Sequence, residues 1–507
     1  MRAQLIPDED DRKRVMFDLV QMAGGPPDPK VKPALQAALD QYGGGQAKRA
    51  QANPMIRANV LLPEARFGIR EEMKQAYGFG WRDHVRGVTT TLDAIENLAF
   101  REKVRAELAR IDAKEHSKLN SGYTLDPAKV TADRRLPHVV VVAANAKGEI
   151  VRYFEAGESA PYFGSPFARD AKTGRYDPAR EARHVASTGK IVAAIAIANE
   201  GRDQPGTLYA DPNAPPKNVE TCEKGGGNTP GQRRAVVAFA CSLNAPLMAR
   251  TAHIGQERVK KIIDGFGFAM PPVDANGERT PPSTATVLGL IGGSPRRVHH
   301  MAAVVTAALT GNGQRPIRAP TSVRAYDYTS VEAAGLATPA EKPIIPNTII
   351  RPEAHAMLKS LLSAPLCHRQ GTTAHGTLRG LAHWCADGRP DLRLHIAKTG
   401  TSTTADPDAT VDTWTTGGIQ FANGATYSYV VMVGTGTARD TWARKLHASQ
   451  ANVPLVEALL VDLKEHARKH APAVATATPA APAQTVAVAK SSKMTTPDWR
   501  DDLKAQR

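Results

Sequence analysis

The chain has 507 residues, of which 42% are hydrophobic, so it is long enough for several domains and for a large apolar core. Its 65 Lys and Arg against 50 Asp and Glu give a formal net charge of +15. No Lys/Arg-rich block is interleaved with aromatic residues, which argues against a nucleic-acid-binding protein. The charge fits either an anionic partner, such as a polyanionic wall or a membrane surface, or a basic surface that is merely solvated.

The N-terminal segment, residues 1–85, shows no recognisable chemistry. Charged helical stretches alternate there with Gly/Pro breaks such as MAGGPPDP, which predicts an accessory region or the remnant of a preceding domain. RAQLIPDEDDRKR, which follows Met1, lacks the apolar core of a signal peptide, and no apolar run is long enough to span a bilayer. If the chain works outside the cytoplasm, we expect its targeting segment to precede this sequence or to belong to another chain.

A linker strand and helix are expected over residues 86–130. The stretch from Val88 to Leu92 is strand-like in its β-branched content. Asp93 can cap the helix that follows, with Glu96 as its partner in a capping box. One apolar face of this helix would be formed by Leu98, Val104, Leu108 and Ile111.

The main domain is expected over residues 131–470, with strands at both of its ends. HVVVVAANAKGEIVRYFEAG, from His138, predicts two strands around a turn at residues 145–148. LRLHIAKTGTS, from Leu392, alternates apolar and polar residues, as a half-buried strand does. GGIQFANGATYSYVVMVGTG predicts two more strands around Asn423-Gly424, a pair typical of a type I′ turn.

Helices are expected between and after these strands. Residues 185–380 are helix-rich, and residues 454–470 have the pattern of an amphipathic helix. We therefore predict an α+β fold, in which the first and last segments form one antiparallel sheet flanked by helices, beside an all-helical subdomain. Residues 471–507 begin with an Ala/Pro/Thr/Val-rich stretch and are predicted to be a disordered tail.

The four cysteines leave two interpretations open. None belongs to a C-x-x-C pair, so a zinc site is not expected. In an oxidising compartment, Cys222–Cys241 and Cys367–Cys385 would be the first choice among three possible connectivities; buried free thiols are the alternative. His299, His300 and His375 are interpreted as polar helix or loop positions and not as metal ligands.

One helix carries a lysine where burial makes it costly. In HVASTGKIVAAIAIANEG, the run from Lys190 to Glu200 has the length and composition of a buried helix, with Gly201 as its stop. An unpaired buried ammonium group tends to lose its proton. Either Lys190 reaches out to solvent or a reaction centre at the mouth of the helix requires it.

Three polar clusters stand out because of their order and their positions next to predicted elements. Ser187-Thr-Gly-Lys190 opens the buried helix, Ser242-Leu-Asn244 follows the apolar AVVAFAC, and Lys398-Thr-Gly-Thr401 ends the alternating strand. Each cluster alone occurs readily by chance. All three in this order do not.

Together the clusters resemble the S-x-x-K, S-x-N and K-T-G motifs of active-site serine D,D-transpeptidases, the penicillin-binding proteins, and of their serine β-lactamase relatives. The resemblance covers about residues 85–450. VTTTLD resembles the linker before the transpeptidase domain of class A penicillin-binding proteins, residues 287–313 resemble their Gly-Gly turn and following helix, and GTTAHGT (371–377) resembles the stretch ahead of K-T-G. The chain has no counterpart of the glycosyltransferase glutamate motifs, so polymerisation is not implied.

The resemblance implies a role for each motif residue, and elementary chemistry explains those roles. Ser187 would be the nucleophile, and Lys190, three residues on and on the same face, would take its proton. Lys398 would be the second cation that lowers the pKa of Lys190. Ser242 resembles the family's proton relay, and Asn244 resembles the side chain that binds the substrate's peptide carbonyl.

The K-T-G strand would hold the substrate's carboxylate. Lys398, Thr399 and Thr401 resemble the group that binds the terminal carboxylate of a D-Ala-D-Ala stem, and Gly400 would let the backbone approach the ligand. The N–H groups of Ser187 and Thr401 would form the oxyanion hole. Substrate strands would add to the edge of this strand.

The implied function is cross-linking of peptidoglycan stem peptides in a bacterial cell wall through a Ser187 acyl-enzyme, with β-lactams as inhibitors and without metal or cofactor. A carboxypeptidase activity is compatible with the same site. The implied location is the periplasm or the outer face of the inner membrane. Two alternatives remain: a β-lactamase-like hydrolase, and a catalytically idle module that still binds peptidoglycan or an assembly partner.

Overall fold

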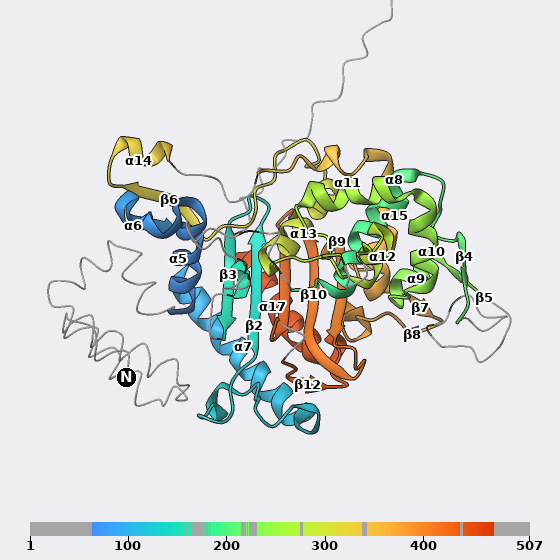
Figure 1. Cartoon of the computed structure of the whole chain (residues 1–507), viewed down its shortest axis with the longest axis horizontal. Coiled ribbons are helices and arrows are strands. Elements are labelled where there is room, and N and C mark those ends of the chain that lie inside the picture. Colours follow the sequence, from blue (N-terminus) through green and yellow to red (C-terminus); the bar gives the residue numbers. More distant parts are fainter. Residues whose placement is uncertain are drawn as a thin grey trace, which may run out of the picture. The chain divides into compact units, whose positions relative to one another are not determined.

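The computed structural model describes most of the chain between residues 63 and 470 (Figure 1). The described residues are 63–157, 161–164, 168, 177, 181, 183–213, 220, 222, 231–273, 277–336, 342–436 and 440–470. Most of the predicted N-terminal accessory region and all of the predicted tail, residues 471–507, lie outside them. The boundaries predicted for the four segments stay a prediction.

Helices and strands both occur along the whole described part of the chain. The α-helices are α5 (Pro63–Tyr77), α6 (Trp81–His84), α7 (Ala94–Glu115), α8 (Lys190–Glu200), α9 (Ala235–Ala240), α10 (Ala245–Ile254), α11 (Gln256–Phe266), α12 (Pro282–Leu288), α13 (Pro295–Leu309), α14 (Val331–Gly335), α15 (His355–Cys367), α16 (Ala448–Ala451) and α17 (Val453–Lys469). The strands are β1 (Val85–Thr90), β2 (His138–Asn145), β3 (Ile150–Ala156), β4 (Leu208–Asp211), β5 (Gly231–Arg234), β6 (Val323–Tyr328), β7 (Arg369–Gln370), β8 (Thr373–Ala374), β9 (Leu392–Thr403), β10 (Ala409–Phe421), β11 (Thr426–Gly434) and β12 (Ala443–Arg444). Two 3₁₀ turns, η7 (Ala186–Gly189) and η10 (Arg379–Trp384), lie close to the motif residues in sequence or in space.

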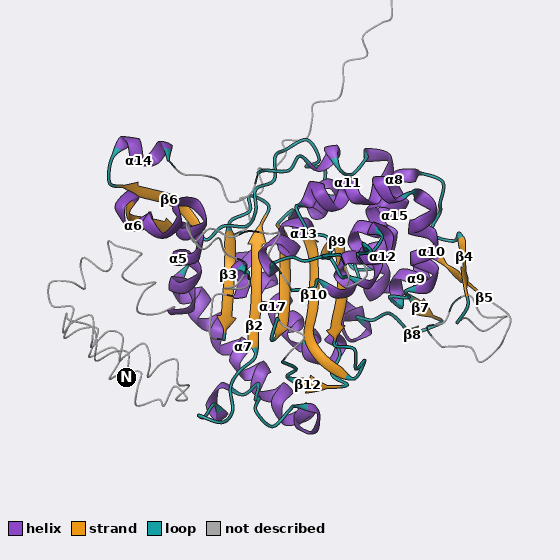
Figure 2. Ribbon diagram, in the orientation of Figure 1, coloured by secondary structure: helices purple, strands orange, loops and turns teal. Residues whose placement is uncertain are grey.

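One antiparallel sheet forms the centre of the fold (Figure 2). Its strands follow the order β9-β10-β11-β2-β3, and the short β12 also pairs with β10. Strands from the two ends of the domain therefore lie side by side: Val142 of β2 pairs with Val430 of β11, and Thr416 of β10 pairs with both Val430 and Lys398. The predicted α+β fold is confirmed.

Helices cover both faces of this sheet, because its strands are apolar on both sides. Val140 and Val142 of β2 face the apolar cluster that contains residues of α8 and α13. The alternate residues Val139 and Val141 face a second cluster, to which α7 and α17 contribute (Figure 1). Since successive side chains of a strand point to opposite faces, a continuous valine run suits a strand that is buried twice.

The all-helical part is built around α8. Its residues from Lys190 to Ala198 are buried, and α10, α11, α12 and α15 pack against it. Gly201 ends the helix with a φ of 73°, a left-handed conformation that glycine adopts without strain. The predicted bounds of this helix are confirmed.

The linker elements differ from the prediction in detail. The first strand, β1, begins at Val85, earlier than expected, and pairs with the distant β6. Asp93 caps α7 by accepting a hydrogen bond from the backbone N–H of Glu96, at 2.9 Å. Glu96 does not complete a capping box; its carboxylate binds the guanidinium of Arg152 at 2.9 Å.

The face of α7 that packs on the sheet also differs. Val104, Leu108 and Ile111 are buried there as expected, and Phe100 joins them. Leu98 packs instead against the cluster on the other face of the sheet.

Two predictions about the strands were wrong. Of the turn residues Asn423 and Gly424, only Gly424 has a positive φ, 87°, whereas a type I′ turn needs two. Asn423 is fixed by tertiary contact, since its Nδ2 donates to the carbonyl of Ala467 in α17. His395, expected on a polar face of β9, is fully buried and hydrogen-bonds the hydroxyl of Tyr429.

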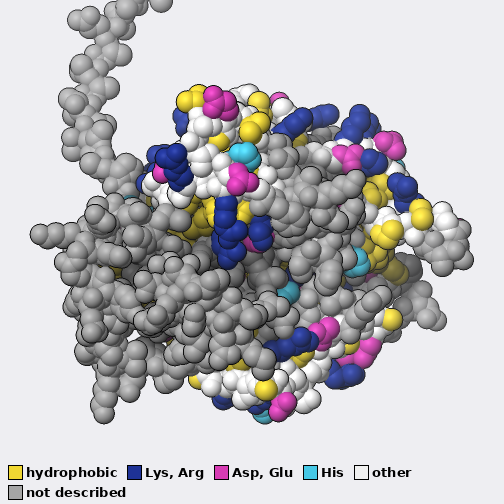
Figure 3. Space-filling view, turned by 60° about the vertical axis from the view of Figure 1, so that its left-hand side comes forward, with side chains coloured by type: hydrophobic (Ala, Val, Ile, Leu, Met, Phe, Trp, Pro, Cys, Tyr) yellow, Lys and Arg dark blue, Asp and Glu magenta, His cyan; other side chains and the backbone are white. Residues whose placement is uncertain are grey.

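Within the described residues, no helix combines the length and the apolar character that crossing a membrane requires. On the face that Figure 3 shows, Lys and Arg side chains are interspersed with Asp and Glu wherever side chains are described. This agrees with a positive charge that is spread along the sequence.

Candidate active site

The turn that carries Ser187 is held in a rare backbone conformation. Ala186 has a φ of 50°, which is uncommon for a residue with a Cβ atom. Its N–H donates to the carbonyl of Gly289, at 3.0 Å. A Cβ atom on Gly289 would lie 1.6 Å from the carbonyl oxygen of Ala186, so only glycine fits at that position. This packing fixes the backbone conformation next to Ser187, just before the first turn of α8.

Lys190 lies directly beneath Ser187. Its Nζ is 2.6 Å from Ser187 Oγ and 2.8 Å from Asn244 Oδ1. The side chain is fully buried, and burial followed by repulsion from Lys398 holds the pKa of Lys190 well below its usual value. A neutral amine at this distance can accept the proton of the serine hydroxyl.

The second motif lies in the short connection between α9 and α10. Ser242 has a φ of 55° there, and its N–H donates to the carbonyl of Phe239. Asn244 immediately precedes α10 and is exposed, while its side-chain oxygen accepts the hydrogen bond from Lys190. The connection between α9 and α10 thus places the hydroxyl of Ser242 and the amide of Asn244 on the helical side of the site.

Lys398 reaches the centre from the sheet. Its Nζ donates to Ser242 Oγ at 2.7 Å and to the backbone carbonyl of Thr399 at 2.9 Å. The side chain is fully buried, and that burial lowers the pKa of Lys398 to about 7. The prediction that K-T-G ends its strand was wrong, because β9 continues to Thr403.

Strand β9 borders the site. Along its length β9 pairs only with β10 among the described strands, so its other edge is unpaired there, while η7 packs on a face of β9 and β10. A Cβ atom on Gly400 would lie 2.9 Å from the amide nitrogen of Ser187 and 3.1 Å from that of Thr188. Thr401 is half-buried next to Gly400, and its Oγ1 accepts from the N–H of Ala448.

The structure therefore brings the residues of all three motifs to one place. Two lysine–serine pairs, Lys190–Ser187 and Lys398–Ser242, lie side by side, and Asn244 joins the first of them. Sequence reasoning assigned no role to Thr377, whose Oγ1 lies 2.9 Å from Thr399 Oγ1. The stretch GTTAHGT that contains Thr377 was recognised, but nothing in it shows which hydroxyl meets the strand.

A pocket opens beside the second motif. It is lined by Ser242, Asn244, Met248, Leu288, the buried ion pair of Asp211 with Arg233, and neighbouring residues. The pocket shares Ser242 and Asn244 with the second motif and continues over the start of α10. Its wall offers both apolar surface and hydrogen-bonding groups to a ligand.

The four cysteines are paired, and the three histidines lie in the core or in a loop. Disulfides join Cys222 to Cys241 and Cys367 to Cys385. His299 is a buried hydrogen-bonded residue of α13, with Tyr162 and Ser428 as its partners, and His300 bonds the carbonyl of Ile317 in the same core. His375 lies half-buried in the loop between β8 and η10.

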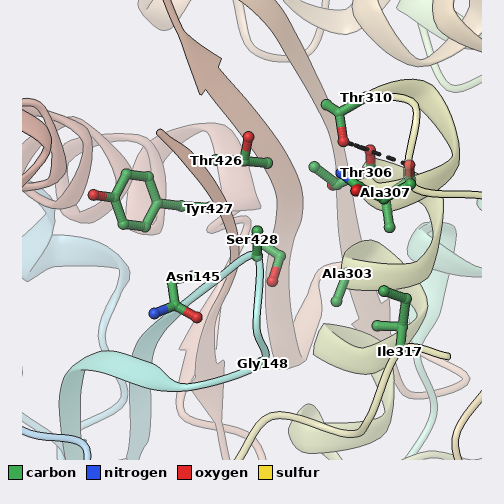
Figure 4. Close-up of a pocket in the computed structure, with 12 residues that line it drawn as sticks. Asn145, Gly148, Ala303, Thr306, Ala307, Thr310, Ile317, Thr426, Tyr427 and Ser428 are labelled. Carbon is green, nitrogen blue, oxygen red and sulfur yellow. Dashed lines mark hydrogen bonds between the residues drawn. The ribbon is translucent and has the colours of Figure 1, made fainter. Parts of the chain in front are cut away.

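Another cavity lies between α13, β11 and the turn after β2 (Figure 4). Its described lining combines small, amide and hydroxyl side chains, among them Asn145, Thr306 and Ser428, with the aliphatic Ile317, and contains no charged residue. Figure 4 shows the hydroxyl of Thr310 bonded back to carbonyls of its own helix. The hydroxyl of Ser428 in this lining bonds Nε2 of the buried His299, at 3.0 Å, and the lining contains neither Lys190 nor Lys398.

No family model and no curated protein matches the sequence. Penicillin-binding protein 3 of Mycobacterium tuberculosis matches in structure with a TM-score of 0.47 and 16% identity, over 75% of this chain and 80% of that one. The penicillin-binding protein PonA1 of the same organism matches with a TM-score of 0.47 and 16% identity, over 79% of this chain and 90% of that one. PBP2 of Pseudomonas aeruginosa matches with a TM-score of 0.45 and 16% identity, over 74% of this chain and 75% of that one. In its fold, the chain resembles penicillin-binding proteins.

Proposed function

We propose that the protein is a penicillin-binding serine acyltransferase that acts on the D-Ala-D-Ala end of peptidoglycan stem peptides. The observation that carries the proposal is the pair of fully buried lysines, each less than 3 Å from a serine hydroxyl. Among the described residues, neither Lys190 nor Lys398 forms an ion pair with a carboxylate. Buried amines without counter-ions are costly, and such groups are found where chemistry needs a neutral base.

Acylation follows from the contacts of Ser187. Its Oγ attacks the carbonyl carbon of the penultimate D-Ala while its proton passes to the Nζ of Lys190. The oxyanion that forms is stabilised by the N–H groups of Ser187 and Thr401. The C–N bond then breaks, and the leaving amine of D-Ala takes a proton through Lys190 or the hydroxyl of Ser242.

Deacylation reverses these roles. An acceptor amine gives up a proton to Lys190 as it attacks the ester, its new C–N bond forms, and Ser187 leaves as the hydroxyl. Attack by water instead gives the carboxypeptidase outcome. Neither step requires a redox partner.

The remaining motif residues hold the substrate. Lys398, Thr399 and Thr401 bind its terminal carboxylate, and Asn244 binds the peptide carbonyl before the scissile bond. The free edge of β9 accepts the extended peptide as an additional strand, so backbone hydrogen bonds align the carbonyl with Ser187.

This function places the protein where stem peptides occur, in the periplasm or at the outer face of the inner membrane. The two disulfides fit an oxidising compartment of this kind.

The test is labelling with a fluorescent penicillin, followed by mass spectrometry of the labelled peptide. We expect a stable adduct on Ser187, no adduct in Ser187→Ala, and acylation slowed about a thousandfold or more in Lys190→Met. Lys359→Met, which changes an exposed lysine of α15, is the matched control and should acylate normally.

Other outcomes point elsewhere. Rapid release of hydrolysed penicillin would favour a β-lactamase-like hydrolase. A folded protein that takes up no label would favour an idle module that only binds peptidoglycan or a partner.

A further inference from the structure

A short segment, residues 368–378 between α15 and η10, connects two of the three motifs. The Oγ1 of its Thr377 lies 2.9 Å from the Oγ1 of Thr399 in K-T-G. The N–H of Thr377 donates at 2.9 Å to the carbonyl of Ala240, the last residue of α9. Since Ser242 follows two residues later, Thr377 ties the K-T-G strand to the Ser242–Asn244 connection.

Two disulfides hold this segment at its sides. Cys367, which ends α15 just before the segment, is joined to Cys385, which follows η10. Cys241 precedes Ser242 and is joined to Cys222, whose Sγ lies 3.0 Å from the carbonyl oxygen of His375. A disulfide sulfur carries no proton, so this last approach is a packing contact.

Backbone contacts leave the segment little freedom. The N–H of Leu378 donates to the carbonyl of Pro365 in α15, at 2.9 Å, and the N–H of His375 donates to the carbonyl of His368, at 3.1 Å. A Cβ atom on Gly376 would lie 2.0 Å from the carbonyl oxygen of Pro365. The close-packed segment 368–378 therefore holds Thr377 next to Thr399.

The hydroxyl contact has a consequence for ligand binding. A hydroxyl has one proton to donate and can accept from other groups. In the structure the Thr399 hydroxyl donates to Thr377 Oγ1. When a carboxylate occupies the site, the Thr399 hydroxyl can turn to donate to it, and Thr377 can then donate to Thr399 Oγ1. Thr377 thereby orients the Thr399 hydroxyl toward the ligand without touching the ligand itself.

We propose that Thr377 is a positioning residue for carboxylate recognition, and that the Cys222–Cys241 and Cys367–Cys385 disulfides hold it in place, so that substrate affinity depends on the oxidised state of the protein. This inference rests on the proposed function for the identity of the ligand. The redox step is reduction of two disulfides to four thiols by two molecules of an external dithiol, each of which is oxidised to its cyclic disulfide.

The first test separates binding from chemistry in the acylation kinetics of the whole chain. For Thr377→Val, we expect the dissociation constant of the non-covalent penicillin complex to rise about tenfold, while the acylation rate constant changes less than twofold. Thr377→Ser should restore affinity, and Thr372→Val, at an exposed position of the same segment, should change nothing. An unchanged dissociation constant in Thr377→Val would overturn the proposal.

The second test is reduction with dithiothreitol, with four thiols counted by a chromogenic reagent. We expect the reduced protein to lose at least as much affinity as Thr377→Val. A variant with all four cysteines changed to serine should show the low affinity with or without dithiothreitol. Full affinity in the reduced wild type would refute the part assigned to the disulfides.

Hydrogen exchange makes the test independent of the proposed activity. Peptides that cover residues 392–403 should exchange faster in Thr377→Val and in the reduced protein than in the oxidised wild type. If wild-type protein takes up no penicillin, the proposed function fails, and the exchange rates still decide whether Thr377 and the disulfides hold the strand. Unchanged exchange in both proteins would reject that role.

Discussion

Two lysines without carboxylate partners among the described residues define the chemistry at the scale of single residues. The amine of Lys190 is the more strongly perturbed, because it is buried and also faces Lys398. The pKa of Lys398 is lowered by burial to about 7. The shifts favour a neutral amine on Lys190, next to Ser187, and a partly charged amine near pH 7 on Lys398, at the proposed carboxylate position.

The sign of the pH dependence follows from these two shifts. Burial and repulsion from Lys398 lower the pKa of Lys190 well below its usual value, which favours the neutral amine that serves as base. Lys398 is charged below about pH 7 and neutral above it, so it loses its attraction for a carboxylate as the pH rises. We expect the second-order acylation rate with a penicillin to fall between pH 7 and pH 9, in stopped-flow measurements.

Two controls accompany this pH profile. The methyl ester of the same penicillin has no carboxylate, so its rate should not show the fall. A rate that rises steadily to pH 9 with the free acid would contradict the assignment of Lys398.

At the scale of elements, the proposed reaction centre depends on how closely β9 approaches η7. Gly400 makes that approach possible, since a Cβ atom there would meet backbone atoms of Ser187 and Thr188, which cannot move aside as a flexible side chain can. The strand pattern predicted β9, but neither its full length nor its distance from η7 could be read from the sequence. Both are set by packing between segments that are far apart in the chain.

Gly400→Ala is expected to push β9 away from η7. A displacement of about 1 Å at the nucleophile slows acylation about a hundredfold, which penicillin labelling over time will measure. Gly206→Ala is the matched control, because nothing lies within 4 Å of the atom it adds. Equal acylation by the two variants would show that the close approach is unimportant.

At the scale of the whole molecule, buried ion pairs join the helices to the sheet. Asp462 of α17 accepts hydrogen bonds from Arg152 of β3 and, at 2.7 Å, from Lys103 of α7. Arg152 is 3% exposed and also binds Glu96. The cluster therefore connects both helices on this face with the strand beneath them.

Asp462→Asn leaves the guanidinium of Arg152 with one carboxylate fewer in a buried site. We expect the free energy of unfolding to fall by about 3 kcal/mol, measured by urea denaturation of the whole chain. Asp264→Asn, which breaks an exposed pair with Lys260 on α11, should leave stability unchanged within error. A loss no larger than that of the control would show that the cluster does not hold the layers together.

The sequence by itself determined the local features: the bounds of α8, the main strands, the apolar residues of the sheet and the three motifs. Those features depend on side-chain periodicity and on nearby residues. Only the tertiary structure decided which distant atoms meet, because the approach of Lys190 to Asn244 and of Lys398 to Ser242 depends on packing between distant segments. The same packing removes both amines from water, buries His395 and brings Thr377 to Thr399. Contacts of this kind produce no periodic pattern of side chains from which the sequence could predict them.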